Sequence, residues 1–353
     1  MMVRLGAAWR VGVSVLLAGW VWSGCAWAQH DDLYAVDRVV DDATAPVRRQ
    51  AIAQMAVEVA RRLAGPLTDQ QRSALRAASD QAVDWVQRFS YATDTTGAAN
   101  ATDAATVLKL RFDPAVMNQA LADLGIAVWR GARPQTLVWL AVDDGERRYV
   151  VSSESDEAMA RALRAEARRQ GVALRFPLMD LAERRQVKAG DVWGGFHEPL
   201  LQASRRYDAA SVLIGRVRRR GAVATARWTH RLGAADAVSA TADGDLPTVA
   251  DALVSTVFER LVQAFRPLSG ETSTPESVRF TVTDIHDLAA YAAVLRYLQG
   301  LGGIERLQVL RADGHSIEFA AAVAGGMDGL RRVARFGRRL QPPPQGATFR
   351  YLP

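Results

Sequence analysis

Cysteine is almost absent from the sequence, which contains Cys25 alone among 353 residues. The chain beyond residue 25 therefore forms no internal disulfide, has no thiol nucleophile and offers no thiolate ligand to a metal. It must fold by burying apolar side chains. The roughly 325 residues that follow the amino-terminal segment are enough to build ordinary cores.

Long hydrophobic segments are also lacking. The longest run, Val11 to Trp22, is too short for a membrane-spanning helix, which needs about 20 apolar residues. It follows Arg4 and Arg10 with no acidic residue before it, which is the pattern of a secretory signal. We predict a signal peptide over residues 1–28, with cleavage between Ala28 and Gln29.

Cys25 leaves a second interpretation open, because Gly24-Cys25 is also the kind of site that ends a lipoprotein signal. The residue three places before the cysteine is Trp22, where lipoprotein signals normally carry a leucine-like residue. Ordinary cleavage and a periplasmic location are therefore preferred. The alternative is an outer-membrane lipoprotein, and we expect a membrane contact only if Cys25 is lipidated.

Lysine is scarce as well, since Lys109 and Lys188 are the only two and the other 42 basic residues are arginine. The net charge is +6, and loss of two arginines with the signal would leave +4. Short basic runs, such as Arg216 with residues 218–220, are scattered and lack interleaved stacking aromatics. We interpret them as solvated surface, with anionic lipid or glycan binding as the alternative, and predict no nucleic-acid binding.

The sequence also lacks the motifs of catalysis and metal binding. No two of its five histidines lie three to five residues apart, and there is no Gly-x-Ser-x-Gly elbow or phosphate loop. We therefore predict no catalytic residue, no metal site and no cofactor. His197 beside Glu198 could form a catalytic pair, but a loop histidine next to a helix-starting acid is the preferred interpretation.

The pattern over residues 29–132 predicts an N-terminal α+β region. Apolar residues at three-and-four spacing predict helices over residues 47–63 and 69–89, after a strand at 33–40. Asp113-Pro114 is a typical helix start and follows a short strand.

The next stretch, 133–267, has the pattern of a mixed-sheet α/β domain with flanking helices. Thr136 to Val142 is a nearly continuous apolar run, as in strands buried on both faces. A helix is predicted to end at Gly171. A meander of strands over residues 211–242 is predicted to precede an amphipathic helix at 246–265.

Residues 268–277 are polar and contain proline, which indicates a linker. The segment after it, 278–353, alternates strand, helix, hairpin and helix patterns. This βαββα order predicts a ferredoxin-like C-terminal domain. The expected fold class is thus a combination of α/β and α+β.

Several stretches occur in a characteristic order: "RPQTLVWLAV", "DVWGGF", "ASRRYDAASVLIGRV", "ARWTHRL" and "YAAVLRYLQGLGGIERLQVL". With them the chain resembles an exported bacterial family grouped as domain of unknown function 2066, over nearly all of its mature length. That family has no established activity, so the resemblance implies export and no particular chemistry.

A second likeness concerns the element order of residues 136–265. A buried strand, crossover helices, a meander and a long helix resemble the periplasmic domains of envelope accessory proteins, of the Tol-translocation type and of lipoprotein activators of cell-wall synthases. The likeness is one of fold, and function does not follow from fold.

One group of residues in the middle region is the candidate ligand or partner patch. Its members are expected in loops at the ends of elements, where functional side chains are common. They are Trp129, Arg133, Asp180, Asp191, Trp193 and Gly194. Together they could grip a carboxylate, sugar or peptide. The simpler interpretation is that Arg133 pairs with Asp191 to pin loops, and that the tryptophans fill the core.

Two further expectations follow. At the predicted turn around Asp284, His286 and Asp287, Asp287 is expected to cap the following helix, with a bound ligand as the alternative. For the whole protein we expect a non-enzymatic envelope accessory or protein-interaction factor with an envelope protein partner. The alternative is a small-ligand-binding protein or a hydrolase that uses Arg133 and the two aspartates of the patch.

Overall fold

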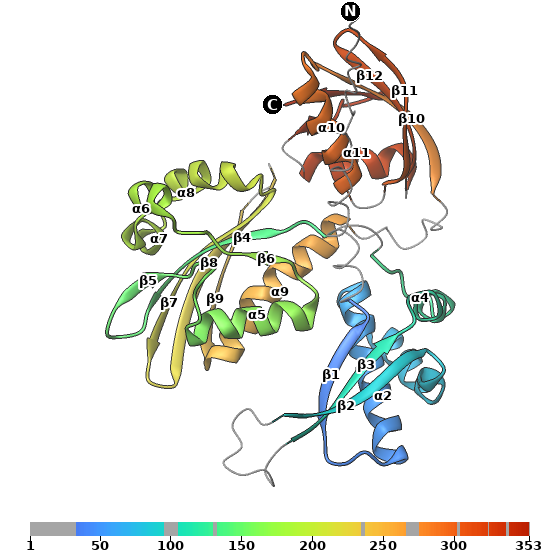
Figure 1. Cartoon of the computed structure of the whole chain (residues 1–353), viewed down its shortest axis with the longest axis vertical. Coiled ribbons are helices and arrows are strands. Elements are labelled where there is room, and N and C mark those ends of the chain that lie inside the picture. Colours follow the sequence, from blue (N-terminus) through green and yellow to red (C-terminus); the bar gives the residue numbers. More distant parts are fainter. Residues whose placement is uncertain are drawn as a thin grey trace, which may run out of the picture.

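The computed structural model describes residues 33–94, 105–129, 133–233, 237–265, 275–301, 304–323, 325–336 and 339–352. The predicted signal peptide, with Cys25 and the Ala28–Gln29 cleavage site, lies outside these residues. Most of the predicted linker at 268–277 also lies outside the described residues. The described residues form three sheets, which Figure 1 shows in three lobes of the molecule.

The first sheet is antiparallel with the order β1-β3-β2. Its strands are β1 (Ala35–Val40), β2 (Val86–Asp94) and β3 (Ala105–Phe112). Its helices are α2 (Ala45–Ala64), α3 (Asp69–Ala77) and α4 (Pro114–Asp123). Ile52, Met55 and Val59 lie on one side of α2 and are fully buried in the same core as Leu108 and Phe112. As predicted, Asp113 caps α4 by accepting hydrogen bonds from two backbone N–H groups.

The predicted helix over residues 69–89 is wrong in its second half. After α3 the chain makes a short 3-10 helix, η1 (Ser79–Val83), and then enters β2. This strand pairs with β3 along its whole length, with an irregularity between Val86 and Arg88. Pairing with a distant strand overrides the local helical spacing here, as tertiary contacts often do.

The middle sheet is mixed and has the order β5-β4-β7-β8-β9, with β6 paired to β4. Its strands are β4 (Thr136–Asp143), β5 (Arg148–Val150), β6 (Leu174–Arg175), β7 (Ser211–Arg220), β8 (Val223–Leu232) and β9 (Val238–Gly244). Strands β4 and β7 run parallel, and β7, β8 and β9 form the predicted antiparallel meander. This confirms the expected mixed sheet.

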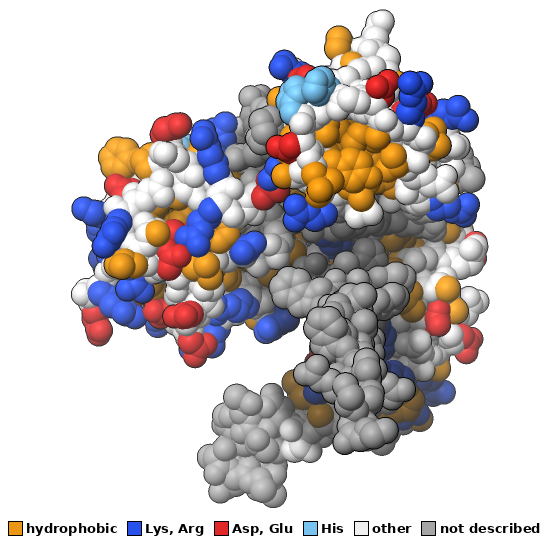
Figure 2. Space-filling model, turned by 45° about the horizontal axis from the view of Figure 1, so that its top comes forward, with side chains coloured by type: hydrophobic (Ala, Val, Ile, Leu, Met, Phe, Trp, Pro, Cys, Tyr) orange, Lys and Arg blue, Asp and Glu red, His pale blue; other side chains and the backbone are white. Residues whose placement is uncertain are grey.

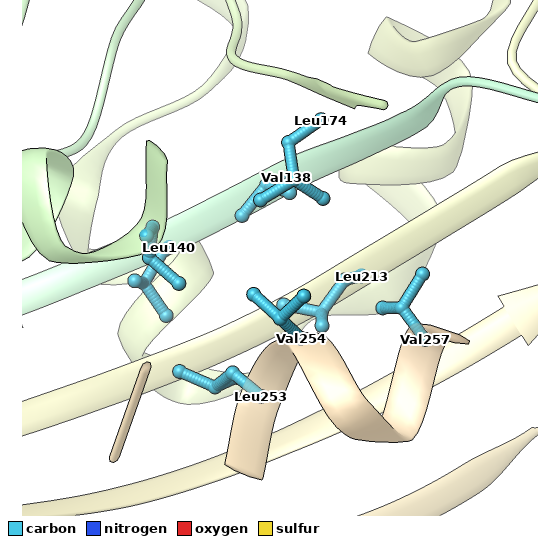
Figure 3. Close-up of a pocket in the computed structure, with 8 residues that line it drawn as sticks. Val138, Leu140, Leu174, Leu213, Leu253, Val254 and Val257 are labelled. Carbon is cyan, nitrogen blue, oxygen red and sulfur yellow. The ribbon is translucent and has the colours of Figure 1, made fainter. Parts of the chain in front are cut away.

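Two helices cover one face of this sheet, α5 (Ala158–Gln170) and α9 (Leu246–Phe265). Figure 3 shows Val138, Leu140 and Leu213 of the strands beside Leu253 and Val254 of α9. The void among these side chains has only about 10 Å³ and an entirely apolar lining. It is about the space of one water molecule without polar partners, so it is a packing defect and not a ligand site.

Three short helices cover part of the opposite face: α6 (Leu181–Gln186), α7 (Ala189–Gly194) and α8 (His197–Ser204). Their core includes Trp139 of β4 and Ile214 of β7, and no residue of β8 or β9. The side chains of β8 that point to this side are exposed or half-buried, whereas those that point to α9 are buried. We call the uncovered side of β7, β8 and β9 the open face.

The C-terminal sheet has the order β11-β12-β10-β14-β13. Its strands are β10 (Glu276–Thr283), β11 (Ile304–Asp313), β12 (Ser316–Val323), β13 (Leu340–Gln341) and β14 (Thr348–Tyr351), and its helices are α10 (Leu288–Gly300) and α11 (Gly326–Phe336). The expected βαββα order is confirmed, and β12 lies between β10 and β11 as in a ferredoxin-like half. Strand β14, which pairs in parallel with β10, and the short β13 were not predicted.

Among the described residues, no helix is both long enough and apolar enough to cross a membrane.

Candidate functional site

Trp129 and Arg133 lie where the first and second sheets meet, and both serve the structure. Trp129 is 3% exposed and stacks on Phe265 of α9, with 5.7 Å between ring centroids. The guanidinium of Arg133 lies 4.5 Å from the centre of the Trp129 ring. Its two terminal nitrogens donate to the backbone oxygens of Gly171 and Arg62, at 2.8 and 2.6 Å. This guanidinium is therefore occupied by backbone carbonyls.

A second buried arginine completes this junction. Arg62, near the end of α2, donates to the backbone oxygens of Leu33, Ala35 and Arg169. Burial, and then the nearby charge of Arg62, lower the pKa of Arg133 to about 10, so that it still carries its charge at neutral pH. The junction ties the start of β1 and the end of α2 to the end of α5.

Gly171 is required at this junction by both its conformation and its surroundings. Its φ is +68°, and a Cβ there would lie 2.5 Å from Cγ of Arg62 and 2.9 Å from Nη1 of Arg133. The predicted helix end at Gly171 is therefore also the point where the two arginines approach the backbone.

Asp180 does not face a ligand site, because it caps α6. Its Oδ1 accepts from the backbone N–H of Glu183 at 2.9 Å, and its Oδ2 lies 2.9 Å from Arg206. Glu183 is buried and accepts hydrogen bonds from the Tyr207 hydroxyl and from the backbone N–H of Met179. Burial, followed by the hydrogen bond to Glu183, raises the pKa of Tyr207 to about 12. This carboxylate cluster thus holds α6 against the sheet.

Asp191, Trp193 and Gly194 lie in α7, so their expected position in a loop is wrong. Asp191 accepts a hydrogen bond from the backbone N–H of Lys188 at 2.8 Å, at the start of this helix. The expected Arg133–Asp191 pair is not formed, since each side chain is bonded to backbone groups elsewhere. The six residues of the predicted patch therefore do not form one site.

Trp193 is the one member of the predicted patch that borders an open hollow. The guanidinium carbons of Arg148, Arg218 and Arg216 lie 4.1, 5.5 and 5.8 Å from the centre of its ring. Arg216 also donates to the backbone oxygen of Trp193 at 2.8 Å. The indole therefore fixes arginine side chains from two strands at one edge of the open face.

A groove of about 500 Å³ extends from Trp193 across the open face. Each of three strands contributes two polar side chains to it: Arg216 and Arg218 from β7, Thr225 and Arg227 from β8, and Thr241 and Asp243 from β9. The register places Arg216, Arg227 and Thr241 in one row across the strands, and Arg218, Thr225 and Asp243 in the next. The groove is thus a polar surface built by regular strand pairing.

One carboxylate pairs with two arginines beyond one end of this groove. Asp143, the last residue of β4, lies 3.1 Å from Arg220 and 3.4 Å from Arg148. The hydrogen bond from Arg220 is the main reason why the pKa of Asp143 is lowered. By contrast, no described carboxylate lies within 4.0 Å of Arg216, Arg218 or Arg227. Positive charge therefore stays uncompensated inside the groove.

Arginine side chains also occur away from this groove. Figure 2 shows them spread over the visible surface of the middle lobe, at the left, and not in a single stripe. The groove is therefore distinguished by its shape, and not by the number of arginines.

A serine and a histidine meet inside the middle domain, but no substrate can reach them. The Oγ of Ser211 lies 2.8 Å from Nε2 of His230 and 2.7 Å from the hydroxyl oxygen of Thr136. All three side chains are fully buried on the α9 side of the sheet. Burial, and then the charge of Arg260, lower the pKa of His230 to about 3, so the ring is neutral. This arrangement is part of the core.

The turn before α10 also has structural partners. As predicted, Asp287 caps α10 by accepting from the backbone N–H of Ala290 at 2.7 Å. Asp284 pairs with Arg350 of β14 at 2.5 Å, and the rings of His286 and His315 lie 4.8 Å apart. Within the described ranges no group of three or more histidines, cysteines or acidic residues could hold a metal ion.

Sequence reasoning missed the groove because its residues were interpreted as scattered surface charge. A usable signal exists in β8, where Thr225, Arg227, Thr229 and Arg231 alternate with buried and mostly apolar residues. Such alternation indicates one exposed face. It does not show whether a helix covers that face.

Comparison with known proteins gives one match to a family model. Residues 28–130 match a domain of unknown function, DUF8605, and this segment contains the first sheet and its helices. The match corrects the resemblance to domain of unknown function 2066, which no family model supports. All five stretches that suggested that resemblance lie after residue 130. No curated protein and no solved structure matches the chain.

Proposed function

We propose that the protein is an exported, non-enzymatic factor of the bacterial cell envelope that acts by binding another envelope component on its open face. The proposal combines the predicted signal peptide with the state of the charged groups in the middle domain. Helix caps and backbone contacts occupy Asp180, Asp191 and Arg133. In the groove, by contrast, charged side chains remain available to a ligand.

The observation that carries the proposal is the uncovered half of the middle sheet. Helices α5 and α9 pack on one side, whereas α6, α7 and α8 cover β5, β4 and part of β7 on the other. The uncovered half presents a groove with unpaired arginines, which is complementary to a negatively charged surface or ligand. A binding function would use these arginines to contact the negatively charged partner.

The hydrolase alternative loses support from the same geometry. A carboxylate pair for hydrolysis needs two side chains that face a common substrate space. Asp180 and Asp191 instead bond to the first turns of different helices, and the Ser211–His230 pair is enclosed in the core. Small-ligand binding, the other part of that alternative, remains compatible with the groove.

Export is tested on the amino terminus of the purified native protein. Mass spectrometry is expected to find a chain that begins at Gln29, free or cyclised. An acylated Cys25 would instead make the protein a lipoprotein that still faces the periplasm. A chain that retains residues 1–28 and fractionates with the cytosol would contradict the proposed location.

Binding on the open face is tested by site-specific photo-crosslinking in the native host. Thr225 lies in the groove and is exposed, so a photo-reactive phenylalanine derivative at this position should give one discrete adduct with an envelope component. The same substitution at the exposed Arg49 of α2 is the matched control and should give none. The absence of an adduct at residue 225, or the same adducts at both positions, would contradict the proposal.

A further inference from the structure

We infer that the groove binds the phosphate group of a small, hydroxyl-bearing ligand, such as a phosphorylated polyol or sugar. This inference rests on the proposal that the open face is the binding site, and it names the chemistry of the ligand. It depends on the placement of three arginines, on the charge balance of the groove, on its hydrogen-bond donors and on its size.

The first argument is the register of β7 and β8. Arg216 and Arg227 are direct partners across the two strands, and Arg218 stands two residues along β7 on the same face. Side chains at directly opposed positions start about 5 Å apart, where like charges repel. Two guanidiniums with no carboxylate between them are stabilised when an anion occupies the space that they share.

The second argument is the charge of the groove. The positive groups of the lining are Arg216, Arg218 and Arg227, whereas Arg148 and Arg220 pair with Asp143 outside it. Asp243 is the only acidic residue in that lining, so the groove carries a net charge of +2. A phosphate monoester carries about −1.5 to −2 at neutral pH and matches this value.

The third argument is the supply of hydrogen-bond donors. Trp193 holds Arg216 through its backbone oxygen and its ring, so that this guanidinium is oriented before a ligand arrives. Guanidinium groups bind phosphate oxygens with pairs of parallel N–H donors. The hydroxyl groups of Thr225 and Thr241 lie in the same groove. Three phosphate oxygens can thus each find a donor.

The fourth argument is size and composition. A groove of about 500 Å³ falls within the range of about 300–1,000 Å³ that is typical of small-ligand sites. The single aromatic ring, Trp193, has Arg148 stacked at 4.1 Å, which leaves little room for a nucleobase. Asp243 can accept a hydrogen bond from a ligand hydroxyl. A phosphate ester with neighbouring hydroxyl groups fits this set of side chains.

Isothermal titration calorimetry of the mature protein with glycerol 3-phosphate tests the inference. Wild type is expected to bind one molecule per chain, and the double variant Arg216→Gln/Arg227→Gln to bind at least tenfold more weakly. Arg231→Gln removes the same charge from the same side of β8 outside the groove, and should leave the affinity within twofold. Thr225→Val keeps every charge and should also weaken binding. It replaces the double variant as the test if that variant does not fold.

Parallel titrations distinguish the sources of the anion. Succinate is expected to bind much more weakly than glycerol 3-phosphate, and equal binding would overturn the choice of phosphate. Sedimentation with phosphatidylglycerol vesicles, without binding of the soluble ester, would overturn the small ligand in favour of a membrane headgroup. An equal loss of affinity in Arg231→Gln would reduce the effect to unspecific charge attraction and also overturn the inference.

The photo-crosslinking experiment separates this inference from the proposed function. If glycerol 3-phosphate does not bind but residue 225 forms a discrete adduct with a protein, the phosphate inference fails and the open face remains the binding site. If neither occurs, both fail.

Discussion

Replacing Arg62 by methionine is expected to lower the free energy of unfolding by about 3 kcal/mol, because three backbone carbonyl groups lose the donor that this buried side chain provides. The guanidinium of Arg62 is 5% exposed and bonds to the backbone oxygens of Leu33, Ala35 and Arg169. These carbonyls belong to parts of the chain that are far apart in sequence. Urea denaturation followed by circular dichroism and tryptophan fluorescence measures the effect.

The neighbouring arginine of the same helix is the matched control. Arg61 is exposed, so Arg61→Met is expected to change the free energy of unfolding by no more than about 0.5 kcal/mol. Because Arg62 joins the first sheet to α5, its loss should also separate the unfolding of the two parts into distinct transitions. Equal effects of the two substitutions would show that the buried junction contributes little.

Acidification is expected to destabilise the wild-type protein through His230, and His230→Phe should remove this part of the pH dependence. The pKa of His230 is about 3 in the folded chain, against 6.5 for an unperturbed histidine. Between these values the unfolded chain binds a proton that the folded chain does not, so stability falls as the pH is lowered. The loss is about 1.4 kcal/mol per pH unit, or about 3 kcal/mol between pH 6.5 and pH 4.

The measurement is the free energy of unfolding at several pH values from 7.5 to 4 for wild type and His230→Phe. Phenylalanine fills a similar volume, and Ser211 keeps its contact with Thr136. Thr136→Val retains the imidazole and should keep the wild-type slope, which makes it the control. If wild type and His230→Phe lose stability in parallel over this range, the buried imidazole does not govern acid stability.

Much of the fold could be predicted because its signals are local. Asp113 and Asp287 are followed by helices that they cap, and the apolar run in β4 becomes a strand with helices on both sides. The alternation in β8 is likewise a local signal, because it indicates a strand with one buried side. In each case the residues that form an element also carry its pattern.

The errors concern elements that depend on distant partners. The predicted helix ran to residue 89 and so included the first four residues of β2, which pairing with β3 makes a strand. Strand β14 is four residues long and exists by parallel pairing with β10, about 70 residues earlier in the chain. No local spacing of residues in the sequence predicts such a pairing.

The candidate site was predicted less well than the fold. Of the residues chosen for the patch, Trp193 borders the groove, but Trp129 and Arg133 are held in a buried junction. The arginines of the groove come together only through the register of three strands. Three short helices leave one half of the sheet uncovered. Tertiary packing decides which half this is, and no residue pattern in β8 or β9 predicts it.

The two sides of β8 are subject to different constraints, although both belong to the same ten-residue strand. Substitutions at Ala224, Ala226 and Trp228 change a packed interior, where small differences in volume are costly. Substitutions at Thr225 and Arg227 change only what the groove offers to its surroundings. The side chains that line the groove can therefore diverge among descendants of this protein, or be redesigned in the laboratory, while the scaffold that displays them stays intact.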